Sequence, residues 1–216
     1  MSTSLLERLF SFLQHLVFHH IGSKIRTNAL KDIMDYLFIL FEKIGCKFDV
    51  VSEIYLKLYK EIVAQEITLA QITKDDRVLV IGSGSLPATP ILLARDTSAT
   101  VISIDKDLQA VKEAIQYLKS KKLDQMLKVE CANGLTYPLE RFTVIVVLYG
   151  VKQPAEMMRY LASRINQTTK VVFRTITDAK GQIRDKTLDL EQHFIIQKQI
   201  HTQSLGSFDS FLLMKK

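Results

Sequence analysis

The spacing of hydrophobic residues changes near residue 75, and this change divides the chain into two parts. From Leu5 to about Ala70, apolar residues recur three or four positions apart, with breaks near Gly22 and Gly45. This spacing is typical of amphipathic helices. Beyond Asp76, short apolar runs alternate with amphipathic stretches, which is the pattern of buried strands and covering helices. The first part predicts helices over residues 4–20, 28–44 and 51–71.

The second part predicts a parallel sheet, because alternating strands and helices imply right-handed crossovers. The last two apolar runs are joined only by residues 203–207, so they are expected to pair as an antiparallel hairpin. The predicted fold is α/β: a Rossmann-like sheet of five parallel strands plus a C-terminal antiparallel hairpin. An N-terminal helical domain is expected at 1–72 and the α/β domain at 73–216. Strands are expected at 77–81, 99–104, 127–130, 143–148, 170–176, 193–202 and 208–214, with helices at 87–95, 107–121 and 154–165.

Composition and charge narrow the class of partner. The hydrophobic fraction of 47% supports a packed core, and the net charge of +6 comes from residues beyond 70, without an Arg-rich run. No nucleic-acid partner is therefore expected. Two cysteines, Cys46 and Cys131, are too few for a disulfide framework or a metal site, which favours a cytoplasmic setting. Leu5–Ile21 is too short and polar to span a membrane, so a core helix or homodimer contact is expected there.

The run VLVIGSGSLPATPILL, Val78–Leu93, places a glycine-rich turn between a predicted strand and a predicted helix. Gly82 and Gly84 allow a sharp turn and close approach of a ligand. The dinucleotide fingerprint requires a third glycine where Pro87 stands, and Pro87 instead suits the first turn of a helix. The loop therefore favours S-adenosylmethionine over a nicotinamide dinucleotide, as does the hairpin, because the strand plan resembles class I S-adenosylmethionine-dependent methyltransferases.

Two polar residues follow the next strands. Asp105 is expected to accept the ribose hydroxyls of the cofactor, while Asp107 is the better cap for the helix that follows. Asn133, in VECANG, either bonds the adenine or only forms a turn. Thr143 stands where many relatives have an acidic residue, and LYGV at 148–151 lacks the motif of amine methyltransferases. The predicted cofactor contacts are Gly82, Ser83, Gly84, Leu86, Pro87, Asp105, Lys106, Asn133 and Tyr149.

Glu66 is an anomaly in the predicted helix 51–71. At about 100° per residue, its side chain falls within the apolar arc, between the directions of Tyr55 and Tyr59. A carboxylate there must be paired, hydrogen-bonded or open to a cleft. Two interpretations stay open: Glu66 pairs with a basic residue or a tyrosine, or it lines an active site, where burial would make it a stronger base for an amine.

The run VLVIGSGSLPATPILLA resembles the signature G-(S/G)-G-P-L-P-x-T-x-I-x-L-A of nicotianamine synthases and related opine-metallophore enzymes, with Ser85 in place of the first proline. KVVFRT at 170–175 and the ending SFDSFLLMK are similar to strands of the same family. The resemblance covers roughly residues 50–216. It implies transfer of a 3-amino-3-carboxypropyl (aminobutanoyl) group to an amine, with release of methylthioadenosine. It also implies that Glu66, or alternatively Glu61, is the base.

The resemblance further implies that Tyr59 takes part in catalysis and that Tyr55 contacts the substrate. Arg174 is a candidate clamp for a substrate carboxylate, because its guanidinium can bind one through two hydrogen bonds. Three functions remain open at this point. They are an aminobutanoyl transferase acting on a small amine or amino acid, a small-molecule methyltransferase with the same cofactor, and a non-catalytic protein that has kept the fold.

Overall fold

The computed structural model of the chain describes residues 48–177, 181–183, 185, 187–202 and 208–216. The helices predicted at 4–20 and 28–44, and the homodimer contact predicted there, lie outside these residues. The division into domains at residues 72 and 73 stays a prediction. Within the described ranges, no helix combines the length and the apolar character needed to cross a membrane.

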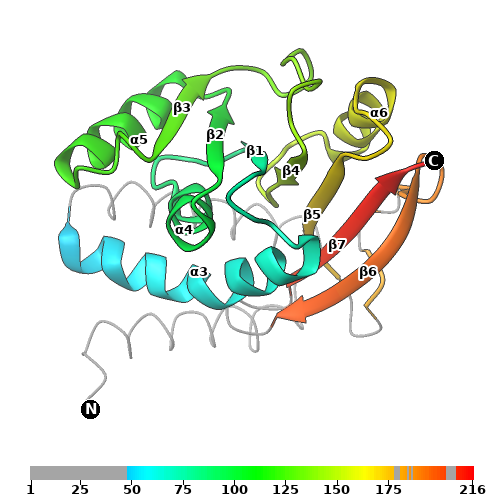
Figure 1. The fold of residues 1–216 in the computed structure, drawn as a ribbon, viewed down its shortest axis with the longest axis horizontal. Coiled ribbons are helices and arrows are strands. Elements are labelled where there is room, and N and C mark those ends of the chain that lie inside the picture. The colour runs from blue at the N-terminus through cyan, green and yellow to red at the C-terminus, as the bar shows by residue number, and fades with distance from the viewer. Residues whose placement is uncertain (1–47, 178–180, 184, 186, 203–207) are drawn as a thin grey trace, which may run out of the picture.

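The described strands form one mixed sheet of seven, in the order β3-β2-β1-β4-β5-β7-β6. The strands β1 to β5 run parallel, and β7 is antiparallel to both β5 and β6. The predicted parallel sheet with a terminal hairpin is therefore confirmed (Figure 1). The strands are β1 Arg77–Ile81, β2 Thr100–Asp105, β3 Leu127–Cys131, β4 Val144–Val147, β5 Lys170–Ile176, β6 Phe194–Thr202 and β7 Phe208–Lys215.

Helices cover both faces of this sheet, as the continuous apolar strands require. In β1, Val78 and Val80 join one core, whereas Leu79 and Ile81 face the core on the other side. Helices α3, α4 and α5 contribute to the first core, and α6 contributes to the second. The helices are α3 Asp49–Ala70, α4 Ala88–Thr97, α5 Leu108–Ser120 and α6 Pro154–Arg164.

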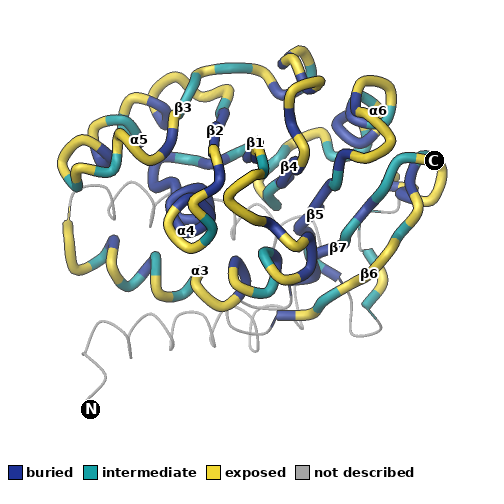
Figure 2. Tube along the Cα trace, viewed as in Figure 1, coloured by how far each residue is buried: buried dark blue, intermediate teal, exposed yellow. Residues whose placement is uncertain are grey.

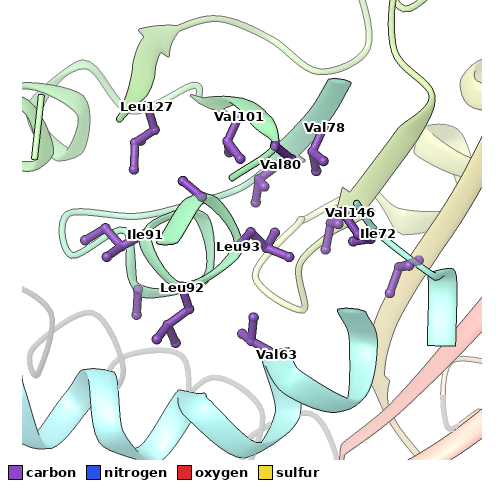
Figure 3. Close-up of a cluster of buried hydrophobic side chains, with 14 of the residues drawn as sticks. Val63, Ile72, Val78, Val80, Ile91, Leu92, Leu93, Val101, Leu127 and Val146 are labelled. Carbon is purple, nitrogen blue, oxygen red and sulfur yellow. The ribbon is translucent and has the colours of Figure 1, made fainter. Parts of the chain in front are cut away.

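The long helix α3 lies on α4 and reaches β5, β6 and β7. Ile62 and Val63 are fully buried, and Figure 3 shows Val63 directed from α3 toward Leu92 and Leu93 of α4. Figure 2 shows that the opposite side of α3 is exposed. The helix ends where Gln71 adopts a left-handed conformation, with φ of 51°. This amphipathic packing brings the sheet-facing side of α3 against β5 and β7.

Candidate active site

The glycine loop leaves β1 at its carboxyl end and turns into α4. Gly82 and Gly84 have φ angles of +88° and +65°, a region that side-chain-bearing residues rarely adopt. A Cβ on Gly82 would also lie 3.2 Å from Cγ2 of Val151. The helix begins at Ala88, so Pro87 precedes the first helical residue instead of occupying it. The predicted start at residue 87 was therefore one residue early.

Asp105 connects the loop to the end of β2. Its Oδ2 accepts a hydrogen bond from the Gly84 amide at 2.9 Å, and its Oδ1 accepts one from the Asp107 amide at 3.0 Å. Asp107 caps α5 by accepting bonds from the amides of Gln109 and Ala110, as the sequence indicated. A carboxylate has about four lone-pair sites, so Asp105 retains acceptor capacity for ligand hydroxyls.

A cavity of about 780 Å³ opens beside this loop and continues toward α3, β5 and β7. Its size lies within the range of small-molecule sites. Two of the predicted site residues, Glu66 and Pro87, do not line it. The predicted residues that do line it are Tyr55, Tyr59, Gly82, Ser83, Gly84, Leu86, Asp105, Lys106, Asn133, Tyr149 and Arg174.

Ser83 supplies an unused polar group to this cavity. The residue is 4% exposed, and its Oγ has no hydrogen-bond partner among the described residues. A buried hydroxyl without a partner is costly unless a ligand or water satisfies it. Together with Asp105, Ser83 gives this end of the cavity hydrogen-bonding capacity for a polar ligand.

Asn133 forms a turn and also lines the cavity. Its Oδ1 accepts a bond from the Leu135 amide at 3.0 Å, and its carbonyl accepts one from the Thr136 amide at 3.0 Å. The two interpretations of Asn133 are therefore compatible. The turn carries the next residue, Gly134, into close packing against Met157 and Ile81.

We expect Gly134→Ala to lower the free energy of unfolding by about 1–3 kcal/mol, as overpacking does. The new Cβ would lie 2.7 Å from Cε of Met157 and 2.9 Å from Cγ2 of Ile81. Because Met157 lines the cavity, its displacement should also weaken ligand binding. Gly150→Ala is the matched control, since a Cβ there meets nothing within 4 Å. Equal urea denaturation curves for the two variants would contradict this packing.

Aromatic side chains surround the other end of the cavity. The Tyr55 hydroxyl donates to that of Tyr59 at 3.2 Å, and the two ring centroids are 4.7 Å apart. Tyr149 meets Phe208 edge to face at 5.4 Å. The sequence reasoning did not single out Phe208, although it lies in the SFDSF stretch whose resemblance to the family's last strand was noted. This end suits a ligand with a flat or aliphatic body.

Glu66 is fully buried, and Arg174 is 3% exposed, in a bidentate ion pair between α3 and β5. The guanidinium Nε and Nη2 donate to Oε1 and Oε2 at 2.9 and 2.6 Å. Ser210 of β7 adds a bond to Oε1 at 2.6 Å. The predicted orientation of Glu66 into the apolar side is confirmed, and the geometry favours its paired interpretation. The alternative base, Glu61, is exposed and bonded to Gln65.

Arg174 has further partners that hold it at the cavity wall. Its Nη1 donates to Oγ1 of Thr89 at 3.2 Å, and its guanidinium carbon lies 5.6 Å from the centre of the Tyr59 ring. Burial by itself would lower the pKa of Arg174, but the charge and hydrogen bonds of Glu66, together with Tyr59 and Tyr55, raise that pKa. Thr89 and Ser210 were not predicted as site residues. Thr89 belongs to the quoted L-P-x-T element. Nothing in the sequence around Ser210 indicates that its hydroxyl bonds Glu66.

Comparison with known proteins gives three kinds of result. No family model matches the chain. The sequence is 29% identical over 121 residues to the L-histidine 2-aminobutanoyltransferase of Yersinia pestis. The matched stretch covers 56% of this chain and 45% of that protein. The enzyme of the same name from Pseudomonas aeruginosa is 26% identical over 128 residues, covering 59% and 49%. The chain thus spans about half the length of the curated relatives that it matches.

Solved structures with the same fold include a point mutant of MtNAS, with a TM-score of 0.78 at 16% identity, covering all of this chain and 90% of that one. The complex of an MtNAS mutant with S-adenosylmethionine gives 0.75 at 16% identity, covering 100% and 92%. An RNA methyltransferase from Salinibacter ruber gives 0.58 at 16% identity, covering 72% and 92%. The chain therefore has the class I S-adenosylmethionine-dependent methyltransferase-like fold in its nicotianamine synthase-like form, and its sequence resembles L-histidine 2-aminobutanoyltransferases.

Proposed function

We propose that the chain binds S-adenosylmethionine and transfers its 3-amino-3-carboxypropyl (aminobutanoyl) group to a small amine or amino acid, releasing methylthioadenosine. One observation carries the proposal. A single cavity joins the Gly82–Gly84 loop and Asp105 to a wall formed by Tyr55, Tyr59 and Arg174. The relatives' names supply the acceptor to test first, which is L-histidine.

The residues at the loop end fit S-adenosylmethionine. Asp105 can accept its ribose hydroxyls, the Ser83 hydroxyl is available, and Gly84 has no Cβ to block a close approach. We assign Asn133, which also lines the cavity, to the adenosyl part. The sulfonium supplies the chemistry, because it activates all three carbons attached to it. Which carbon reacts depends on the carbon against which the acceptor amine is held.

In the proposed reaction, an N–C bond forms between the acceptor amine and the γ-carbon of the methionine moiety as the C–S bond breaks. The electron pair of that C–S bond stays on the sulfur of methylthioadenosine, and the nitrogen, which is positively charged after the attack, releases a proton to water. We place Tyr59 next to that nitrogen, because Tyr59 lines the cavity and its hydroxyl accepts a hydrogen bond from Tyr55. Both oxygens of Glu66 are engaged by Arg174, so we assign Glu66 to positioning Arg174 instead of meeting the amine.

Identification of the nucleoside product tests the proposed function. The protein is incubated with S-adenosylmethionine and L-histidine, and the nucleosides are separated and weighed by mass spectrometry. We expect methylthioadenosine, with much less at the same concentration of S-adenosylmethionine when Asp105 is replaced by Ala. S-adenosylhomocysteine would instead show methyl transfer. Binding of S-adenosylmethionine without turnover, across a panel of amines and amino acids, would show a binding protein that has kept the fold.

A further inference from the structure

Arg174 is held from three directions by residues of three other elements. Glu66 of α3 engages Nε and Nη2, Thr89 of α4 accepts from Nη1, and Ser210 of β7 fixes Glu66 through Oε1. All four side chains are at most 3% exposed. The arginine is therefore locked in one orientation before any ligand arrives, unlike an exposed arginine, which must lose side-chain freedom on binding.

Two N–H donors of the Arg174 guanidinium are not used by these hydrogen bonds. Of its five N–H groups, three are used by Glu66 and Thr89, and the other two have no partner among the described residues. Arg174 lines the cavity, whereas Glu66 does not. The arginine of this ion pair therefore lines the cavity, and the glutamate does not.

We propose that Arg174 is a preset binding site for the α-carboxylate of an amino-acid ligand, with Thr89 and Ser210 as positioning residues. The inference rests on the proposed function for the identity of the ligands. A carboxylate held by charge-assisted hydrogen bonds in a water-poor site is bound about twice as strongly as a neutral group. Misorienting the donors removes most of that gain, because hydrogen bonds weaken steeply with angle.

Two ligands of the proposed reaction carry such a carboxylate: the methionine moiety of S-adenosylmethionine and the acceptor amino acid. Each has a counterpart without the group. Decarboxylated S-adenosylmethionine lacks only the carboxylate of the donor, and histamine is histidine without its carboxylate. Comparing affinities within each pair isolates the carboxylate from the rest of the ligand and shows which of the two ligands Arg174 binds.

The test uses Thr89→Val, which keeps the shape of the side chain but removes the hydroxyl acceptor. Dissociation constants for the four ligands are measured by calorimetry, with methylthioadenosine present when the acceptors are titrated. We expect about a tenfold loss of affinity for one carboxylate-bearing ligand and less than a twofold change for its counterpart. Ser210→Ala should act in the same way, and Thr89→Ser, which restores a hydroxyl, should recover most of the loss.

Thr202→Val is the matched control. Thr202 is a buried threonine of β6 whose hydroxyl bonds Gln65 of α3 and is not among the groups that bond Arg174 or Glu66. We expect all four affinities to stay within twofold of the wild type. If Thr89→Val weakens both members of each pair equally, or weakens neither, the preset carboxylate site is wrong.

These outcomes are separable from a failure of the proposed function. Carboxylate-dependent binding without any methylthioadenosine formation would support the preset site and contradict the transferase. Turnover by the wild type, with the same ratio of affinities within each ligand pair in Thr89→Val and Ser210→Ala as in the wild type, would support the transferase and contradict the preset site.

Discussion

Glu66→Gln should lower the free energy of unfolding by about 3–5 kcal/mol, which is the usual effect of removing one partner of a buried ion pair. The change removes the negative charge that faces Arg174. The guanidinium remains buried, at 3% exposed, and the side chains that bond it are then all neutral. Chemical denaturation monitored by circular dichroism measures the effect. The loss of stability is this large because a buried charge is left unpaired, and not because one hydrogen bond is missing.

The matched control is Glu61→Gln, on the exposed side of the same helix, which should change the free energy of unfolding by less than about 0.5 kcal/mol. Replacing both partners, as Glu66→Leu with Arg174→Met, should be less destabilising than either single change, because no buried charge is left over. Equal stability of Glu66→Gln and Glu61→Gln would contradict the ion pair. Loss of methylthioadenosine formation in Glu61→Gln alone would overturn our placement of the acceptor site.

Asp105→Ala should weaken binding of S-adenosylmethionine by at least roughly a hundredfold. The change removes acceptors for the ribose hydroxyls and also releases the Gly84 and Asp107 amides, which fix the loop and the start of α5. Calorimetric titration measures the dissociation constant. Asp96→Ala is the control, since Asp96 lies on the outer side of α4 in an ion pair with Arg95. Equal affinities for the two variants would contradict the role given to Asp105.

The strands could be predicted because their signal is local. Parallel strands with both faces covered are usually nearly continuous apolar runs, and the runs at 77–81 and 170–176 match β1 and β5. The hairpin followed from the short connection at 203–207. The helix period alone placed Glu66 on the buried side of α3, because each position in a regular helix has a fixed direction.

The partners of Glu66 could not be predicted, because they come from distant parts of the chain. Arg174 lies 108 residues and Ser210 lies 144 residues beyond it, and only the folded sheet brings β5 and β7 together beneath α3. A carboxylate at an apolar position of a helix indicates that it has a polar partner, but does not identify that partner. For this reason the sequence left both interpretations of Glu66 open, and the predicted role as a base is not the one that the geometry favours.

Thr143 is a residue whose position in the fold could not be judged from the sequence, in which it stands where many relatives have an acidic residue. The structure places Thr143 before β4, at the amino end of that strand, where its hydroxyl donates to Asp76 at 2.7 Å and accepts from the Arg77 amide at 3.0 Å. The cavity lies at the carboxyl ends of the strands, so the identity of residue 143 says nothing about the cofactor.

The central claim is that the acceptor attacks the γ-carbon of the methionine moiety and not the methyl carbon. The most direct test uses two samples of S-adenosylmethionine, one labelled with ¹³C at the γ-carbon and one at the methyl carbon, each incubated with the protein and L-histidine. We predict that the γ-carbon label moves to the acceptor nitrogen, while the methyl label stays in methylthioadenosine. Transfer of the methyl label to the acceptor would contradict the claim.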